Sequence, residues 1–173
     1  MFKTYAEELK WLTTDKVRMS WVAKTIKDIS TSGNTLILVD RISAGTILQE
    51  QLEGSVFVSG STKNIDRKEQ YDEVSTATNK IIIATYGVAS VGINIPRIFN
   101  LVLIEPGKSF VRVIQSIGRG IRKAKDKENV QIWDITSSCK FAKRHLGARK
   151  KFYKEANYPY NICLLYTSPS PRD

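Results

Sequence analysis

The sequence is poor in the residues that form cross-links and metal sites. It has two cysteines and one histidine among its 173 residues. Cys139 and Cys163 form no CxxC pair and share no metal-ligand spacing with His145. This pattern argues against a structural zinc site and a disulfide scaffold, and it favours two isolated, reduced thiols.

Long apolar runs are also missing. No run approaches the roughly 20 residues that a bilayer-spanning helix requires. Residues 1–16 lack the continuous apolar core of a signal peptide. We therefore expect a soluble, cytoplasmic protein with no membrane partner.

Acidic residues are outnumbered by basic ones. The 27 Lys and Arg against 17 Asp and Glu give a formal net charge of +10. Such a balance favours polyanionic partners, either nucleic acid or acidic lipid, and charge alone does not choose between them. A membrane-surface protein would need an amphipathic helix with a strong apolar face opposite its lysines, which the sequence lacks.

The hydrophobic pattern alternates between strand-like and helix-like segments, within a length typical of one domain. Short runs rich in Val and Ile predict strands at residues 35–40, 55–58, 80–85, 100–105 and 130–135. Helices are predicted at residues 18–30, 43–52, 64–75, 109–123 and 137–156. Most strands are apolar on both faces, which indicates an α/β fold with a parallel sheet covered by helices on both sides. Ligands are then expected at the carboxyl ends of the strands.

Residues 115–122, Gln-Ser-Ile-Gly-Arg-Gly-Ile-Arg, lie within the last helix before the fifth strand. At about 100° per residue, one narrow stripe collects Arg112, Gln115, Arg119 and Arg122. A separate stripe, able to face the sheet, collects Ile114, Ile117 and Ile121. Guanidinium groups projecting from an anchored helix can stabilise charge that develops on a γ-phosphate. The spacing alone leaves open a solvated basic face.

Glycines interrupt the same helix. Gly118 and Gly120 each cost about 1 kcal/mol in a helix interior, so they indicate close approach of another surface.

Residues 81–96 form an apolar strand that runs into a loop of small residues. Thr85 and Ser90 can donate hydrogen bonds to a phosphate oxygen, and Gly92 permits close backbone approach. Asn94 could bond a ribose or a partner loop. A plain turn explains the same string.

The second strand runs into a cluster of glycine and hydroxyl residues that opens the next helix. The cluster is Ser59, Gly60, Ser61 and Thr62. Exposed amides and hydroxyls at a helix start suit a nucleic-acid phosphate. An N-capping turn without a ligand is the alternative.

Residues 140–154 combine basic and aromatic side chains. The basic ones are Lys140, Lys143, Arg144, Arg149, Lys150, Lys151 and Lys154, and the aromatic ones are Phe141, Phe152 and Tyr153. Such a segment can bind phosphates and stack bases. A solvated helix with its aromatic residues in the core explains the same string.

Taken together and in this order, these segments resemble the carboxyl-terminal motor domain of superfamily two helicases. The likeness covers roughly residues 35–125: residues 35–52 resemble motif IV, 56–74 motif IVa, 84–96 motif V and 115–122 motif VI. It implies a RecA-like domain of the P-loop NTPase fold. The likeness extends over both flanks to UvsW-type recombination helicases of T4-like bacteriophages, which implies a motor acting on branched DNA and RNA–DNA hybrids.

The resemblance also implies roles for individual residues. Arg119 and Arg122 would reach the γ-phosphate, with Gln115 supporting them. The nucleotide cleft between two motor domains would include Gly92, Asn94 and Gly118. The tracked strand would contact the turn Ser59, Gly60, Ser61 and Thr62 together with Thr85, Lys150 and Lys151. This sequence departs from many relatives at Tyr86, Asn94 and Ser116.

The parts that hold nucleotide are missing from this sequence. It has no GxxxxGK[ST] loop and no Asp-Glu pair closing an apolar strand. ATP and Mg²⁺ would therefore be held mainly by a first RecA-like domain of the same protein. We expect residues 1–16 to be a linker from that domain, 17–136 the motor domain, 137–163 a basic helical extension and 164–173 a non-native disordered tail. A non-catalytic basic module that binds nucleic acid remains the alternative.

Overall fold

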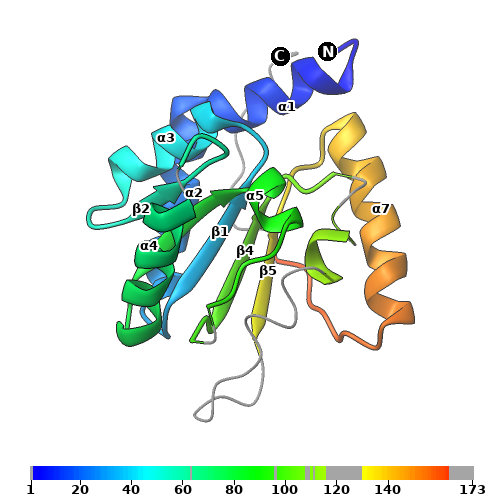
Figure 1. Ribbon diagram of the computed structural model, residues 1–173. Helices are drawn as coiled ribbons and strands as arrows, with labels where there is room; N and C mark the ends of the chain where they lie inside the picture. Colours follow the sequence, from blue (N-terminus) through cyan, green and yellow to red (C-terminus); the bar gives the residue numbers. More distant parts are fainter. Residues whose placement is uncertain are drawn as a thin grey trace.

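The protein folds around one parallel sheet. The computed structural model describes residues 2–62, 64–95, 97–107, 110, 112–115 and 130–163. The strands are β1 (Thr35–Val39), β2 (Val56–Val58), β3 (Ile81–Thr85), β4 (Asn100–Ile104) and β5 (Gln131–Ile135). They lie in the order β2-β3-β1-β4-β5, and every neighbouring pair is parallel (Figure 1). The predicted strand positions and the predicted parallel α/β class are confirmed.

Helices connect the strands and cover the sheet. They are α1 (Tyr5–Thr14), α2 (Lys16–Ser30), α3 (Ile42–Gln51), α4 (Asn64–Thr76), α5 (Tyr86–Ser90) and α7 (Lys140–Glu155). Residues 110 and 112–115 are also helical, at the start of the helix predicted for 109–123. Helices α1 and α5 were not predicted: α1 lies in the expected linker, and α5 lies where a loop was expected. Among the described residues, no helix is both long and apolar enough for a bilayer span.

Alternating strand residues build a core on each face of the sheet. In β1, Leu36 and Leu38 join the cluster on one face, while Ile37 and Val39 join the cluster on the other. The first cluster includes side chains from α4, α5, residues 110, 113 and 114 and α7, and the second includes side chains from α2 and α3. Helices therefore cover both faces, which is why the strands are apolar on both sides.

Local capping defines α1 and the start of α2. The Thr4 hydroxyl accepts a hydrogen bond from the backbone N–H of Glu7 at 3.2 Å. The Asp15 carboxylate accepts one from the N–H of Arg18 at 2.9 Å, at the junction of the two helices. Both are side-chain N-caps of the usual kind. Leu12, which is 1% exposed, anchors α1 to the domain.

Candidate nucleotide and nucleic-acid interface

The predicted site segments follow neighbouring strands at one edge of the sheet. Residues 59–62 follow β2, α5 follows β3, and residues 105–115 follow β4. In a parallel sheet all carboxyl ends lie on the same side, so the fold places these segments along one edge. Figure 1 shows α5 at this edge, with α1 passing across the same end of the molecule.

The turn after β2 is held by its own hydroxyl groups. Thr62 Oγ1 accepts a hydrogen bond from Ser59 N at 3.1 Å, and Thr62 N donates to Ser59 O at 3.1 Å. The Ser59 and Ser61 hydroxyl oxygens lie 2.9 Å apart. Ser59 is buried, whereas Gly60 and Ser61 are exposed. The exposed part of this turn is therefore its tip.

Arg67 on α4 holds the turn through two hydrogen bonds. Its Nη2 donates to Ser59 O at 3.0 Å and to Gly60 O at 3.3 Å. Both carbonyl groups are thus directed toward α4. Sequence reasoning missed Arg67, although a basic residue one turn into a helix that follows a Gly-Ser turn is a signal that could have identified it.

The segment after β3 forms a short helix instead of the expected loop. Thr85 is its N-cap, and its Oγ1 accepts a hydrogen bond from Val88 N at 3.2 Å. That contact uses a lone pair, so the Thr85 hydroxyl hydrogen can still be donated to a phosphate. The Ser90 hydroxyl instead donates to Gly87 O at 2.7 Å, within the helix.

The chain then turns sharply at Gly92. Its φ of +101° is in the region that favours glycine. Ile93 and Ile95 are 3% and 0% exposed, while Asn94 between them is exposed. The buried isoleucines fix the backbone and leave Asn94 on the outer surface.

Tyr86 links α5 to β4. Its hydroxyl donates to Ile104 O at 3.1 Å. Burial raises the pKa of Tyr86 well above its ordinary value, and the nearby Asp134 carboxylate adds to this, so the hydroxyl stays protonated. Tyr86 is thus a neutral hydrogen-bond donor to the end of β4.

The helical residues 110 and 112–115 have one buried side and one exposed side. Phe110, Val113 and Ile114 are 4%, 2% and 5% exposed, whereas Arg112 and Gln115 are exposed. For Arg112, Ile114 and Gln115 the predicted division between a polar stripe and a sheet-facing stripe is confirmed. The predicted site residues Gly118, Arg119 and Arg122 lie outside the described residues.

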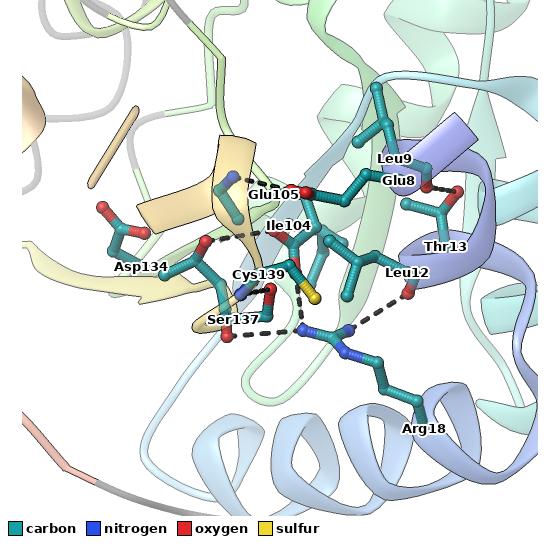
Figure 2. A network of polar contacts seen from close by, with 12 residues as sticks. Glu8, Leu9, Leu12, Thr13, Arg18, Ile104, Glu105, Asp134, Ser137 and Cys139 are labelled. Carbon is teal, nitrogen blue, oxygen red and sulfur yellow. Dashed lines mark hydrogen bonds and ion pairs between the residues drawn. The ribbon is translucent and has the colours of Figure 1, made fainter. Parts of the chain in front are cut away.

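A buried acid immediately follows β4. Glu105 is 4% exposed and has a positive φ of 45°. Its carboxylate is paired with Arg18 of α2 and accepts a hydrogen bond from Thr136 Oγ1 at 3.0 Å. Burial raises the pKa of Glu105 to about 7, while Arg18 and Thr136 act in the opposite direction. Figure 2 shows the Arg18 guanidinium between Glu105 and the carbonyl of Leu12.

The basic segment divides into exposed and buried residues. Lys151 is exposed and Lys150 is half-buried. Arg149 is 0% exposed, where its Nε and Nη2 donate to the two Asp134 carboxylate oxygens at 2.6 and 2.9 Å. Arg149 is therefore a core residue and does not belong to a basic surface, contrary to the sequence grouping.

The aromatic residues of α7 also divide. Tyr153 is buried and Phe152 packs against the same core cluster, so these rings serve the core as the alternative interpretation held. Phe141 is partly exposed, with Lys140 Nζ 5.3 Å and Arg144 Cζ 5.6 Å from its ring centre.

Residues 18–124 match the family described as the helicase conserved C-terminal domain. The chain belongs to this family. The ATP-dependent DNA helicase UvsW of Enterobacteria phage T4 is 30% identical over 161 residues, which cover 90% of this chain and 32% of the relative. This helicase C-terminal domain thus spans about a third of the length of that relative.

Solved structures show the same fold. The crystal structure of T4 UvsW has a TM-score of 0.74 at 24% identity, covering 88% of this chain and 35% of that chain. The C-terminal domain of the DEAD-box protein Dbp5 has a TM-score of 0.64 at 19% identity, covering 80% of both chains. The domain is therefore RecA-like, with a five-stranded parallel sheet in its described part.

In this helicase C-terminal domain, α1 is bound to α7. The Glu8 carboxylate accepts hydrogen bonds from the backbone N–H groups of Phe141 at 2.9 Å and Ala142 at 2.6 Å. Glu8 is 1% exposed. An acidic side chain from another helix therefore caps the first turn of α7, where negative charge is stabilising.

Proposed function

We propose that this domain is the second motor domain of an ATP-dependent helicase that remodels branched DNA or RNA–DNA hybrids, as in recombination. One observation carries the proposal. The helical residues 110 and 112–115 are anchored to the core by Val113 and Ile114 and expose Gln115 on their other side. The sequence period places Arg119 and Arg122 in the same stripe as Gln115.

In this proposal, two domains together form the nucleotide site. The sequence has no phosphate loop, so a first RecA-like domain of the same protein holds ATP and Mg²⁺, which supply the phosphoryl group and neutralise its charge. Residues 1–16 include the connection to it. This domain contributes Arg119 and Arg122 to the γ-phosphate, supported by Gln115. The domain cleft includes Gly92, Asn94 and Gly118.

Nucleic acid is proposed to bind along the carboxyl edge of the sheet. Gly60 and Ser61 present the exposed tip of one turn, and Thr85 retains a hydroxyl hydrogen for donation. In the proposal, Ser59 and Thr62 shape that turn, and Lys150 and Lys151 add charge from α7. The net charge of +10 supports a polyanionic strand as the partner. The similarity to a DNA helicase supports DNA as that strand.

The test compares arginine variants in the intact protein that contains this domain. Arg119→Ala and Arg122→Ala are expected to lower DNA-stimulated ATP turnover by on the order of 10³-fold, because each removes charge stabilisation from phosphoryl transfer. DNA affinity should stay close to wild type. Arg119→Lys is the matched variant, since it keeps the charge but loses the planar fork. Unchanged turnover in both alanine variants would remove the assignment.

The isolated chain provides the second test. Without a phosphate loop, the purified 173-residue chain should hydrolyse no appreciable ATP. Rapid DNA-stimulated turnover by this chain would contradict the proposal that a first domain holds the ATP. An intact protein that binds DNA but never hydrolyses ATP would instead support the non-catalytic binding module.

A further inference from the structure

Three consecutive residues after β4, Glu105, Pro106 and Gly107, form what we term the β4 turn. The next described residues along the chain, 110 and 112–115, are helical. Its backbone departs from regular structure at Glu105, where φ is 45°. A non-glycine residue with positive φ is held there by its surroundings, since the conformation is unfavourable by itself.

Side chains from other elements hold Glu105. Arg18 of α2 pairs with one carboxylate oxygen and Thr136, just after β5, donates to the other at 3.0 Å. Arg18 also donates to Leu12 O at 3.1 Å and to Thr136 O at 3.3 Å (Figure 2). The guanidinium therefore joins the end of α1, the β4 turn and the segment after β5 through one rigid group.

Side chains from α7 and α1 contact the other two residues of the turn, Pro106 and Gly107. Arg149 Nη1 of α7 donates to Pro106 O at 2.7 Å. Gly107 lies against the ring of Tyr5 from α1, since a Cβ added at this glycine would be 3.0 Å from the tyrosine hydroxyl. The turn is thus fixed by α1, α2 and α7 together.

The same turn is connected to the segment after β3. Tyr86 of α5 donates to Ile104 O, the carbonyl immediately before Glu105. The segments proposed to grip nucleic acid and to present the arginines therefore meet at the end of β4. Catalytic groups must be held within about 0.5 Å of their working positions, and a displacement of about 1 Å can cost 10²-fold in rate.

We propose that Arg18 and Glu105 are a pair of positioning residues for ATP hydrolysis, which hold the β4 turn and thereby set where the following helix presents its arginines to nucleotide on the neighbouring domain. The inference rests on the function proposed above. The pair touches no substrate and acts through Arg119 and Arg122. The end of α1 is tied to the same turn through Arg18 and Tyr5.

The experiment uses the intact helicase that contains this domain. Arg18→Ala, Arg18→Lys and Glu105→Gln are compared with Lys24→Ala, which removes an exposed basic residue from the same helix. Turnover number, KM for ATP and DNA affinity are measured per folded molecule, well below the unfolding temperature. Arg18→Ala and Glu105→Gln should lower kcat by about tenfold or more without a matching change in DNA affinity. Lys24→Ala should match wild type, and Arg18→Lys should recover part of the loss.

A double variant distinguishes positioning from a general loss of structure. Because Arg18 is proposed to act through the arginine helix, combining Arg18→Ala with Arg119→Ala should be no worse than Arg119→Ala alone. Independent losses that multiply, or wild-type kcat per folded molecule in the Arg18 and Glu105 variants, would overturn the inference. If Arg18→Ala does not fold, Glu105→Gln takes its place in the double variant.

The result for Arg119→Ala separates the two proposals. Unchanged turnover in both Arg119→Ala and Arg122→Ala would overturn the proposed function. A defective Arg119→Ala enzyme beside fully active Arg18 and Glu105 variants would overturn only the positioning role.

Discussion

Replacing Arg149 by methionine should destabilise the domain strongly, although this residue lies in a lysine-rich segment of the sequence. Its side chain is 1% exposed, and its partner Asp134 is 13% exposed. The substitution removes two hydrogen bonds to Asp134 and one to Pro106 O. Removing one partner of a buried ion pair costs about 3–5 kcal/mol, because the other charge is left uncompensated.

The structure favours the lower part of that range. Asp134 keeps a hydrogen bond from the Tyr153 hydroxyl at 2.8 Å and retains some exposure. A loss of about 3 kcal/mol should lower the melting temperature by roughly 6–12 °C in a domain of this size. Urea unfolding followed by circular dichroism measures the free energy directly.

Two further variants make this prediction specific. Lys151→Met changes an exposed neighbour on the same helix and should alter stability by no more than about 0.5 kcal/mol. Adding Asp134→Asn to Arg149→Met should recover part of the loss, because the unpaired charge is removed. A loss below about 1 kcal/mol for Arg149→Met alone would refute the view that this pair holds α7 to the sheet.

Other predictions test the cap, the buried acid and the packing of glycines. Glu8→Ala should destabilise the domain by about 1–2 kcal/mol and speed amide exchange in the first turn of α7, because two N–H groups lose their acceptor. The folded-state pKa of Glu105 is raised from 4.5 to about 7. Between these two pH values the Glu105 carboxyl is therefore more protonated in the folded state than in the unfolded state. The contribution of Glu105 to stability should therefore fall as pH rises through that window, and Glu105→Gln should remove this component in urea titrations at several pH values. Gly45→Ala should destabilise by about 1–3 kcal/mol because its Cβ would lie 2.3 Å from the Phe57 ring, whereas Gly147→Ala, with open space in α7, should stabilise by about 0.5–1 kcal/mol in the same assay.

Periodicity determined most of the secondary structure of this protein. The five strands are local runs of apolar residues, and α2, α3, α4 and α7 carry enough turns for their pattern to be recognised. Helix α5 has five residues, too few for a period to show, and its N-cap at Thr85 serves a turn equally well. Helix α1 was missed although Thr4 and Glu7 carry a capping signal, because the segment was assigned to a linker.

The site was partly determined by the sequence as well. Segments at the carboxyl ends of parallel strands must share an edge, so the placement of residues 59–62, α5 and residues 105–107 along one edge followed from the predicted sheet. The sequence also divided Ile114 from Arg112 and Gln115 correctly. These inferences hold because they depend only on local period and strand direction.

Only the tertiary structure decided which charged residues are internal. Arg18 and Glu105 are 87 positions apart, and no local pattern indicates that they meet. Arg149 is surrounded in sequence by lysines, yet it lies in the core because α7 turns that one side toward Asp134. A long basic side chain is as well suited to water as to a buried carboxylate, so its environment depends on what the fold brings to it.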